Sequence, residues 1–512
     1  MLTALDYTVL GVYLVGVAAL GIKMSGKQST ATDYFLGGRD LPWWAVCFSV
    51  VATETSTLTV IGIPAVAYGG SLTFFQLTFG YLVGRVVVAW LFLPRYLSGS
   101  MRTAYEFLGT RYGDGVRSLA SVTFLVTRLL ADGVRLFATA IPVRVMFLSA
   151  GVDVGYPAII VVIALATTLY TLIGGLRAVV WVDVVQMALY LGGGIVALWL
   201  LAGTVPDGWM ADAATAGKLV TFLPGEGWIS ILTSPYVIPT AVLGGAIFSM
   251  ASHGTDQLIV QRLLACRSLG DSRKALIGSG FMVMLQFALF LAVGLMLWAH
   301  YGGATMAELG LSRGDEVFPK FIIEGMPPGV SGLLLAGIIA AAMSTLSSSL
   351  NALASSTVFD LLGYVRRLRN PNAAPLSDAA EVKVSRMATL VWGAVFVVFA
   401  NLFRDQQNPV VELGLAIASF TYGGLLGAFL LGMLNSRTRS WDVGIALVAS
   451  VGVMTLIIFG VWHGEAGWQV IFRPSAEVIA EYGLKSIAWP WYTAIGASVT
   501  FAIGSLTALR HR

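Results

Sequence analysis

The sequence predicts an all-α protein that crosses a membrane many times. Its 512 residues are 57% hydrophobic and 11% charged, and the mean hydropathy is +0.81. A soluble domain has about 25% charged residues. Long apolar runs recur from one end of the chain to the other. Because these runs are continuous, they exclude a transmembrane β-barrel, whose segments alternate over about ten residues.

About thirteen segments meet the criterion of about twenty predominantly apolar residues. The first has no positive residue before it and no small-residue cleavage site, so we expect a retained helix. The connections are short, which predicts one transmembrane domain over residues 1–512. The spans cover approximately residues 5–23, 41–68, 72–95, 118–149, 156–174, 181–203, 234–264, 275–300, 329–362, 384–404, 409–433, 440–462 and 487–508.

Lysine and arginine gather in alternate connections, which predicts the orientation. The connections after the first, third, seventh and ninth spans are the most basic, with residues such as Lys23, Arg95, Arg267 and Arg366. Cytoplasmic loops are enriched in these residues. We therefore expect a multi-pass protein of the plasma (inner) membrane with its N-terminus outside and its C-terminus in the cytoplasm. The net charge of +4 then reflects topology, and no nucleic-acid partner is expected.

A ledge of hydroxyl groups lies within the ninth span. Ser344, Thr345, Ser347 and Ser348 fall within an arc of roughly 160° at about 100° per residue. Polar atoms at membrane depth need partners, and neutral oxygens suit a hard monovalent cation. The alternative is that the hydroxyls bond back to their own helix or let neighbouring helices pack closely.

Two spans, 41–68 and 234–264, are polar and are interrupted by small residues and proline. Such segments at corresponding places in two halves of a transporter indicate a site near the bilayer midplane. There, unwound backbone supplies carbonyl groups to a cation. A packing seam rich in glycine and serine is the alternative. Glu54 argues against it, because a carboxylate inside a membrane is costly without a role.

Several motifs occur in the order in which one transporter family has them. On these motifs the chain resembles the solute:sodium symporter family over nearly its whole length. Members carry sugars, sialic acid, proline, pantothenate, iodide or monocarboxylates, so the resemblance indicates mechanism better than substrate. The motifs are Tyr34–Arg39, Leu41–Trp44, Gly62–Ala65, Thr103–Leu108 with Arg111 and Tyr112, Gly174–Leu176 with Trp181 and Asp183, Asp256–Arg262, Ser344–Asn351 and Ser419–Gly423.

The resemblance implies a leucine-transporter-like (LeuT-like) fold of two inverted five-helix repeats with broken helices. The repeats would cover approximately residues 41–203 and 234–433, with accessory helices at 5–23, 440–462 and 487–508. The resemblance also implies a common sodium site. Its ligands would be the backbone oxygens of Ala52, Thr55 and Ala341 and the hydroxyls of Ser344 and Thr345.

Part of the family has a second sodium site, and the matching positions here are chemically competent. They are Asp183, Ser344, Ser347 and Ser348. The alternative for Asp183 is a helix-start carboxylate beside Arg177. A carboxylate inside a span and facing hydroxyls is the better interpretation. We therefore favour two Na⁺ ions per solute.

The resemblance places the solute beside the two interrupted spans. Members that carry sialic acid have small hydroxyl residues where Glu54 stands, and their carboxylate-binding arginine does not align cleanly with Arg128 or Arg135. Glu54 and Asp132 are suited to accept hydrogen bonds from sugar hydroxyls or to pair with a substrate amine, whereas a simple anion would meet repulsion. Internal ion pairs, of Glu54 with Arg135 or of Asp132 with Arg128 or Arg135, are the alternative. The candidate contacts are Glu54, Ser56, Thr59, Phe74, Thr78, Asp132, Arg135, Ser249, Ser252, His253, Gln286, Thr421 and Tyr422.

These observations together predict a monomeric sodium-coupled secondary active symporter. It would import a small polar organic solute, with a sugar or sugar derivative favoured, by alternating access in the lipid bilayer. The alternative solutes are a monocarboxylate, sialic acid or an amino acid. The alternative class is a membrane sensor without transport, which counterflow of labelled solute in liposomes would separate from a carrier. No enzyme is expected, since no nucleophile–base pair, metal-ligand spacing or phosphate loop stands out.

Overall fold

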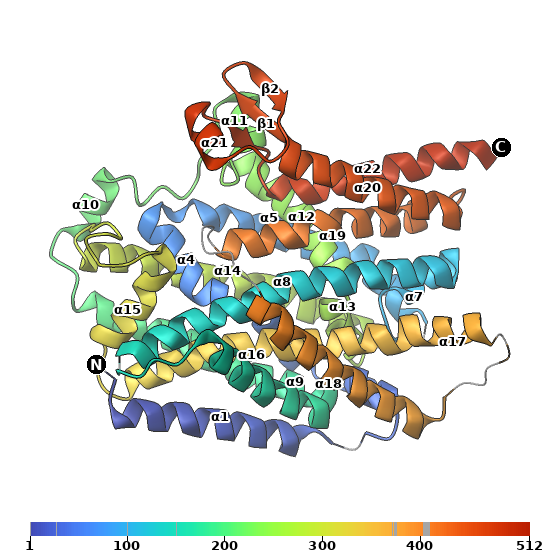
Figure 1. Ribbon diagram of the computed structural model, residues 1–512, viewed down its shortest axis with the longest axis horizontal. Coiled ribbons are helices and arrows are strands. Elements are labelled where there is room, and N and C mark those ends of the chain that lie inside the picture. The colour runs from blue at the N-terminus through green and yellow to red at the C-terminus, as the bar shows by residue number, and fades with distance from the viewer. Residues whose placement is uncertain are drawn as a thin grey trace.

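Long helices that lie side by side make up nearly the whole protein (Figure 1). A computed structural model describes residues 2–26, 28–99, 101–149, 151–370, 372, 376–402 and 410–511. The N-terminus lies at one end of the bundle with α10 (Trp209–Thr215) and α15 (Val317–Glu324), and the C-terminus lies at the other with α7 (Glu106–Tyr112) and α17 (Gly363–Arg369) (Figure 1). The predicted all-α membrane fold is confirmed.

The first part of the chain forms nine α-helices and two short 3₁₀ helices. They are α1 (Ala4–Met24), α2 (Ala31–Leu36), η1 (Gly37–Arg39), α3 (Trp43–Glu54), α4 (Thr57–Gly69), η2 (Leu72–Phe75), α5 (Gln76–Leu91), α6 (Leu93–Leu97), α7 (Glu106–Tyr112), α8 (Asp114–Ser149) and α9 (Tyr156–Ala202).

The second part adds further α-helices, the π-helices η3 and η5, and one small antiparallel sheet in the order β2-β1-β3. The helices are α10 (Trp209–Thr215), α11 (Gly227–Thr233), η3 (Thr240–Gly244), α12 (Gly245–Gly254), α13 (Gln257–Leu264), α14 (Leu269–His300), η4 (Gly314–Glu316), α15 (Val317–Glu324), α16 (Val330–Ser356), η5 (Thr357–Leu362), α17 (Gly363–Arg369), α18 (Asp378–Leu402), α19 (Val410–Leu434), α20 (Ser440–Gly460), α21 (Ala476–Glu481), α22 (Pro490–Ala508) and η6 (Leu509–His511). The strands are β1 (Val461–Gly464), β2 (Gly467–Val470) and β3 (Lys485–Ser486).

The predicted spans coincide with these helices, but two of them fall within one element. Helix α9 has 47 residues, or about 70 Å at 1.5 Å per residue, which is about twice the thickness of the hydrocarbon core. The helix breaks at Gly175, whose φ is 55°. A Cβ at this position would lie 2.4 Å from the carbonyl oxygen of Tyr34, so the break requires glycine.

The number of membrane-spanning helices is smaller by a strict criterion. Among the described residues, eight helices are long and apolar enough to cross a membrane, or nine if α3 and α4 form one bent span. The count of thirteen therefore stays a prediction. Position 409 and positions 403–404, at the edges of two predicted spans, lie outside the described residues.

Helix α16, which carries the hydroxyl ledge, lies at the centre of the bundle. In the continuous span Val330–Arg369, 89% of the most apolar window is buried, against 22% in α1 and 33% in both α18 and α20. Helix α16 packs against α9, α1, α8 and α3. The polar ledge is therefore enclosed by protein, while α1, α18 and α20 form part of the periphery.

Glycines let two other helices approach the broken segments. A Cβ at Gly294 of α14 would lie 2.2 Å from the carbonyl oxygen of Pro64 in α4. A Cβ at Gly84 of α5 would lie 2.3 Å from the carbonyl oxygen of Ala246 in α12. Real Cβ atoms essentially never come so close, so these two contacts hold α4 and α12 against their neighbours at backbone distance.

Candidate functional site

The first break separates α3 from α4, whose axes differ by 63°. Thr55 and Ser56 between them are extended, with ψ of 100° and 173°. The hydroxyls of Thr53 and Thr55 donate to the carbonyl oxygens four residues earlier, at 2.7 and 2.8 Å. Such back-bonding competes with a regular helix. The end of α3 therefore presents carbonyl groups without helical partners inside the bundle.

The second break separates α12 from α13 at Thr255 and Asp256. The Asp256 carboxylate accepts a hydrogen bond of 2.8 Å from the backbone N–H of Leu258 and so caps α13. Asp256 is fully buried. Both polar, glycine-interrupted spans are thus broken helices in the structure.

The hydroxyl of Thr345 faces the first break. Its Oγ1 lies 3.4 Å from the carbonyl oxygen of Thr53, 3.5 Å from that of Thr55 and 3.2 Å from that of Ala341. Three carbonyls and one hydroxyl therefore converge between α3 and α16. This set of neutral oxygens fits a sodium ion. The carbonyl of Thr53 is an addition to the predicted ligands, next to the fully buried Ala52.

Replacing Thr345 by alanine is expected to raise the sodium concentration for half-maximal uptake. Losing one oxygen next to a cation costs about 1.5–3 kcal/mol, the range of hydrogen bonds to charged groups, which is about tenfold to a hundredfold in affinity. Uptake measured against sodium concentration in proteoliposomes checks this. Thr345→Ser keeps the hydroxyl and should stay close to the unaltered protein, and equal sodium dependence in all three proteins would contradict the site.

One of the remaining ledge residues, Ser344, contacts Asp183, which is fully buried. The Asp183 carboxylate accepts hydrogen bonds of 2.7 Å from Ser344 and 2.5 Å from Ser49. The Ser347 hydroxyl donates to the carbonyl oxygen of Ser344 at 3.0 Å. The Ser348 hydroxyl lies 3.0 Å from that of Thr53. Of the three hydroxyls predicted to bind a second ion with Asp183, only that of Ser344 bonds to the carboxylate, while those of Ser347 and Ser348 have other partners.

Arg262 is the residue of this cluster that the sequence interpretation missed. It lies 3.4 Å from Asp183, donates to Ser49 at 2.9 Å and also donates to Ser348. The side chains of Arg262 and Asp183 are both 0% exposed. The alternative partner considered for Asp183 was wrong, because Arg177 pairs with Asp40 at 3.1 Å. The charge of Asp183 is thus balanced by an arginine on α13.

A cavity lies beside both breaks and encloses about 930 Å³, counting its mouth. Ten of the thirteen predicted solute contacts line it. Thr78, Asp132 and Thr421 do not, since the hydroxyl of Thr78 donates to the carbonyl of Phe75 and that of Thr421 bonds to Thr127. The lining residues are Thr53, Glu54, Thr55, Ser56, Leu58, Thr59, Ile63, Phe74, Tyr81, Arg85, Arg128, Arg135, Phe248, Ser249, Ser252, His253, Leu258, Ile259, Val283, Gln286, Phe287, Ala418 and Tyr422.

Glu54 is held inside the cavity by two partners from other helices. Its carboxylate bonds to Arg85 of α5 and to His253 of α12. The predicted alternative pair of Glu54 with Arg135 is therefore wrong. Because Arg85 compensates the charge of Glu54, this carboxylate does not by itself repel an anionic solute.

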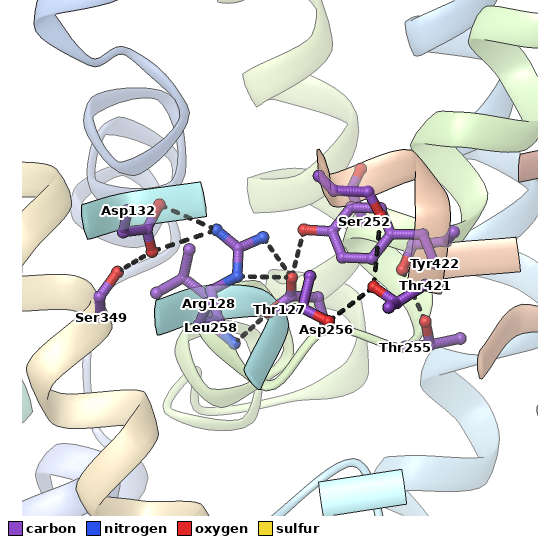
Figure 2. Close-up of polar contacts among 12 residues, drawn as sticks. Thr127, Arg128, Asp132, Ser252, Thr255, Asp256, Leu258, Ser349, Thr421 and Tyr422 are labelled. Atoms are coloured by element: carbon purple, nitrogen blue, oxygen red, sulfur yellow. Dashed lines mark hydrogen bonds and ion pairs between the residues drawn. The ribbon is translucent and has the colours of Figure 1, made fainter. Parts of the chain in front are cut away.

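A second charged network links the second break to α8 and α16, as Figure 2 shows. Arg128 lies between Asp256, at 3.0 Å from its Nε, and Asp132, at 3.4 Å. Asp132 also accepts from Arg135 at 2.9 Å and from Ser349 of α16. The alternative of internal ion pairs of Asp132 with Arg128 and Arg135 is thus confirmed. Asp132 is therefore bonded to two arginines and a serine, and it does not line the cavity.

Comparisons with known proteins agree with this geometry. The sodium/sialic acid symporter NanT of Aliivibrio fischeri is 27% identical over 88% of this chain and 87% of its own. The human sodium/iodide cotransporter is 29% identical over 89% of this chain and 70% of its own. A substrate-bound, outward-open structure of a Na⁺-coupled sialic acid symporter is 26% identical, covers 99% of this chain and 98% of its own, and has a TM-score of 0.81.

A further solved structure shares the fold alone. It is a nucleobase-cation-symport-1 family transporter in a closed conformation, 13% identical over 95% of each chain with a TM-score of 0.53. Broken helices around an oxygen-lined site, in this fold, define a sodium-coupled secondary transporter. The model of the sodium:solute symporter family matches residues 34–442, and the chain belongs to that family. It is a membrane symporter of sodium and a small solute, and not an enzyme.

Proposed function

We propose that this symporter imports a small polyhydroxylated organic acid, such as a sugar acid. The observation that carries the proposal is an excess of donors in the cavity wall. Among the described residues, Nε of Arg135 and both Nε and Nη1 of Arg85 are buried without an acceptor. A buried donor without a partner is costly. A solute with a carboxylate and several hydroxyl oxygens supplies the missing acceptors.

Arg135 is the better candidate for the carboxylate. Its side chain is 16% exposed, whereas that of Arg85 is 0% exposed. An arginine binds a carboxylate with charge-assisted and often paired hydrogen bonds. Three of the relatives are named for sialic acid, iodide or monocarboxylates, which are acids or anions as well. The proposed solute is thus a sugar derivative, as the sequence favours, that also carries an acid group.

The rest of the cavity suits the body of a sugar. Its polar side chains include Ser56, Thr59, Ser249, Ser252 and Gln286, which can donate to and accept from hydroxyl groups. The apolar lining includes the aromatic side chains of Phe74, Tyr81, Phe248, Phe287 and Tyr422. Apolar lining with a few placed polar groups is typical of small-molecule sites.

A thermal-shift screen tests the solute class, because a ligand that binds the folded state stabilises it. Glucuronate and N-acetylneuraminate are expected to raise the melting temperature in sodium and to do so less in potassium. Glucose lacks the carboxylate and lactate lacks the polyhydroxylated body, so both should raise the melting temperature less. A larger effect of glucose than of both acids would end the proposal.

Arg135→Gln is expected to weaken the acid's binding by about tenfold to a hundredfold, since a charge-assisted hydrogen bond is worth about 1.5–3 kcal/mol. Sodium binding without solute should stay unchanged, because Arg135 does not belong to the sodium ledge. Equilibrium binding of the labelled acid measures the first effect and sodium-dependent thermal stability the second. Arg135→Lys keeps the charge and should lose less than Arg135→Gln. Equal losses of solute and sodium binding would contradict the proposal that Arg135 binds the carboxylate of the solute.

Coupling to two sodium ions is the second part of the proposal. One ion would bind beside Thr345 and the other at Asp183 with Ser347 and Ser348. Because Arg262 already balances Asp183, an added sodium ion would leave one uncompensated buried charge. We therefore expect the guanidinium of Arg262 to withdraw from Asp183 when the second ion binds.

The repeats, orientation and assembly are also proposals. We assign the repeats to residues 41–203 and 234–433, with α1, α20 and α22 as accessory helices. The basic last turn of α17 lies at the same end as the C-terminus (Figure 1), which supports a cytoplasmic C-terminus and an external N-terminus. We propose one copy in the plasma (inner) membrane as the working unit.

A further inference from the structure

A groove runs between the first half of α18 and α9 on the periphery of the bundle, away from the solute cavity. It encloses about 650 Å³, counting its open side. Six lining residues follow helical spacing along one face of α18, and Leu172 of α9 lies opposite. The residues of α18 are Ala379, Val382, Lys383, Arg386, Met387 and Leu390.

Two basic residues in this groove have no acidic partner. Within the part of the chain that the structure describes, neither Lys383 nor Arg386 pairs with a carboxylate, and Arg386 has one hydrogen bond of 3.4 Å, to Gln28. Glu381, on the same helix, is engaged with Arg102 at 3.5 Å instead. The groove therefore offers two uncompensated positive charges one helical turn apart.

An apolar surface continues directly from these charges. Met387, Leu390 and Val391 of α18 are each about half exposed, as is Leu169 of α9. Only 33% of the apolar window of α18 is buried, so we expect this surface to face the hydrocarbon of the bilayer. The arrangement places a pair of cations at the end of a lipid-facing stripe, which is the shape of a phospholipid with its headgroup and acyl chains.

We propose that this groove binds an anionic glycerophospholipid. The phosphate accepts hydrogen bonds from Lys383 and Arg386, and an acyl chain lies along Met387 and Leu390. A soluble phosphate would gain only the first of these contacts. Because α18 also packs against α16 and α9, the bound lipid would stabilise the contact between the sodium-binding helix and its outer neighbours.

Native mass spectrometry of the full chain, titrated with phosphatidylglycerol or phosphatidylcholine in detergent, tests the proposal. The unaltered protein should retain phosphatidylglycerol more strongly. In the double variant Lys383→Gln/Arg386→Gln, the affinity for phosphatidylglycerol should fall by about thirtyfold, the contribution of two basic side chains at an anionic surface. The affinity for phosphatidylcholine and the melting temperature in phosphatidylcholine should not change.

The matched control is Lys274→Gln/Arg437→Gln. It removes two exposed basic residues that do not line the groove and should keep the affinity for phosphatidylglycerol. Equal losses in the two double variants would mean unspecific surface attraction and would overturn the site. Displacement of the lipid by inorganic phosphate at comparable concentration would also overturn it, because the groove would then be a phosphate site. Solute specificity plays no part in any of these readouts.

Discussion

Replacing Asp256 by asparagine is expected to lower the free energy of unfolding by about 3–5 kcal/mol, the cost of removing one partner from a buried ion pair. The Asp256 carboxylate accepts from Nε and Nη2 of Arg128 at 3.0 and 2.5 Å, from the backbone of Leu258 at 2.8 Å and from the hydroxyl of Tyr422. All of these partners meet inside the bundle (Figure 2). Asparagine keeps the shape but removes the closer of the two acidic partners of Arg128.

Replacing Asp256 should also change the binding of the solute. Without Asp256, Arg128 has only Asp132 as an acidic partner, and Asp132 is also the partner of Arg135. The cavity wall then carries one more net positive charge, so we expect Asp256→Asn to strengthen binding of an acidic solute in the fraction that remains folded. Chemical unfolding in mixed micelles measures the stability, and equilibrium binding of the labelled acid measures the second effect.

Two matched variants separate charge from shape. Tyr422→Phe removes one hydroxyl donor and is expected to cost about 1 kcal/mol. The double variant Asp256→Asn/Arg128→Met removes both charges and should recover part of the lost stability. If the free energy of unfolding of Asp256→Asn equals that of the unaltered protein, the ion pair of Asp256 and Arg128 in Figure 2 does not stabilise the fold.

The hydroxyl ledge could be predicted from the sequence because its geometry is local. Ser344, Thr345, Ser347 and Ser348 belong to one helix, and helical spacing alone brings them to one side. The breaks were predictable for the same reason, since the hydroxyls that compete with α3 lie within four residues of their acceptors. The broken-helix fold followed from these patterns together with the family resemblance.

The ion pairs of Glu54 and Asp183 were not predictable, because their partners are distant in sequence. Arg85 and Glu54 are 31 residues apart, and Arg262 and Asp183 are 79 apart. One signal was available for Arg85, which stands alone in the middle of the predicted span 72–95. A charge inside a span needs a partner, and Glu54 was the nearest intramembrane acid. For Arg262 the position at the end of a span suggested a cytoplasmic loop, whereas the broken helix α13 turns it inward.

The coupling ratio has the largest expected effect on what the protein can do. For a solute with one negative charge, one sodium ion gives electroneutral transport, and a tenfold sodium gradient sustains about tenfold accumulation. A second ion adds about 1.4 kcal/mol from the gradient and about 2.3 kcal/mol from 100 mV, or several hundredfold more accumulation. We expect two ions. Transport then moves one net positive charge, and its reversal potential in proteoliposomes should shift with the sodium gradient.

Asp183→Asn is expected to reduce the ratio to one and to make transport of the acid electroneutral. The same change leaves Arg262 buried without its acidic partner at 3.4 Å, so stability should fall as well. Asp183→Asn/Arg262→Gln removes both charges and should regain stability while the ratio stays at one, which separates ion binding from folding. Asp40→Asn, which removes the partner of the exposed Arg177, is the control and should keep the ratio at two. Electroneutral transport in the unaltered protein would give Asp183 and Arg262 a purely structural role, with Thr345 marking the single sodium site.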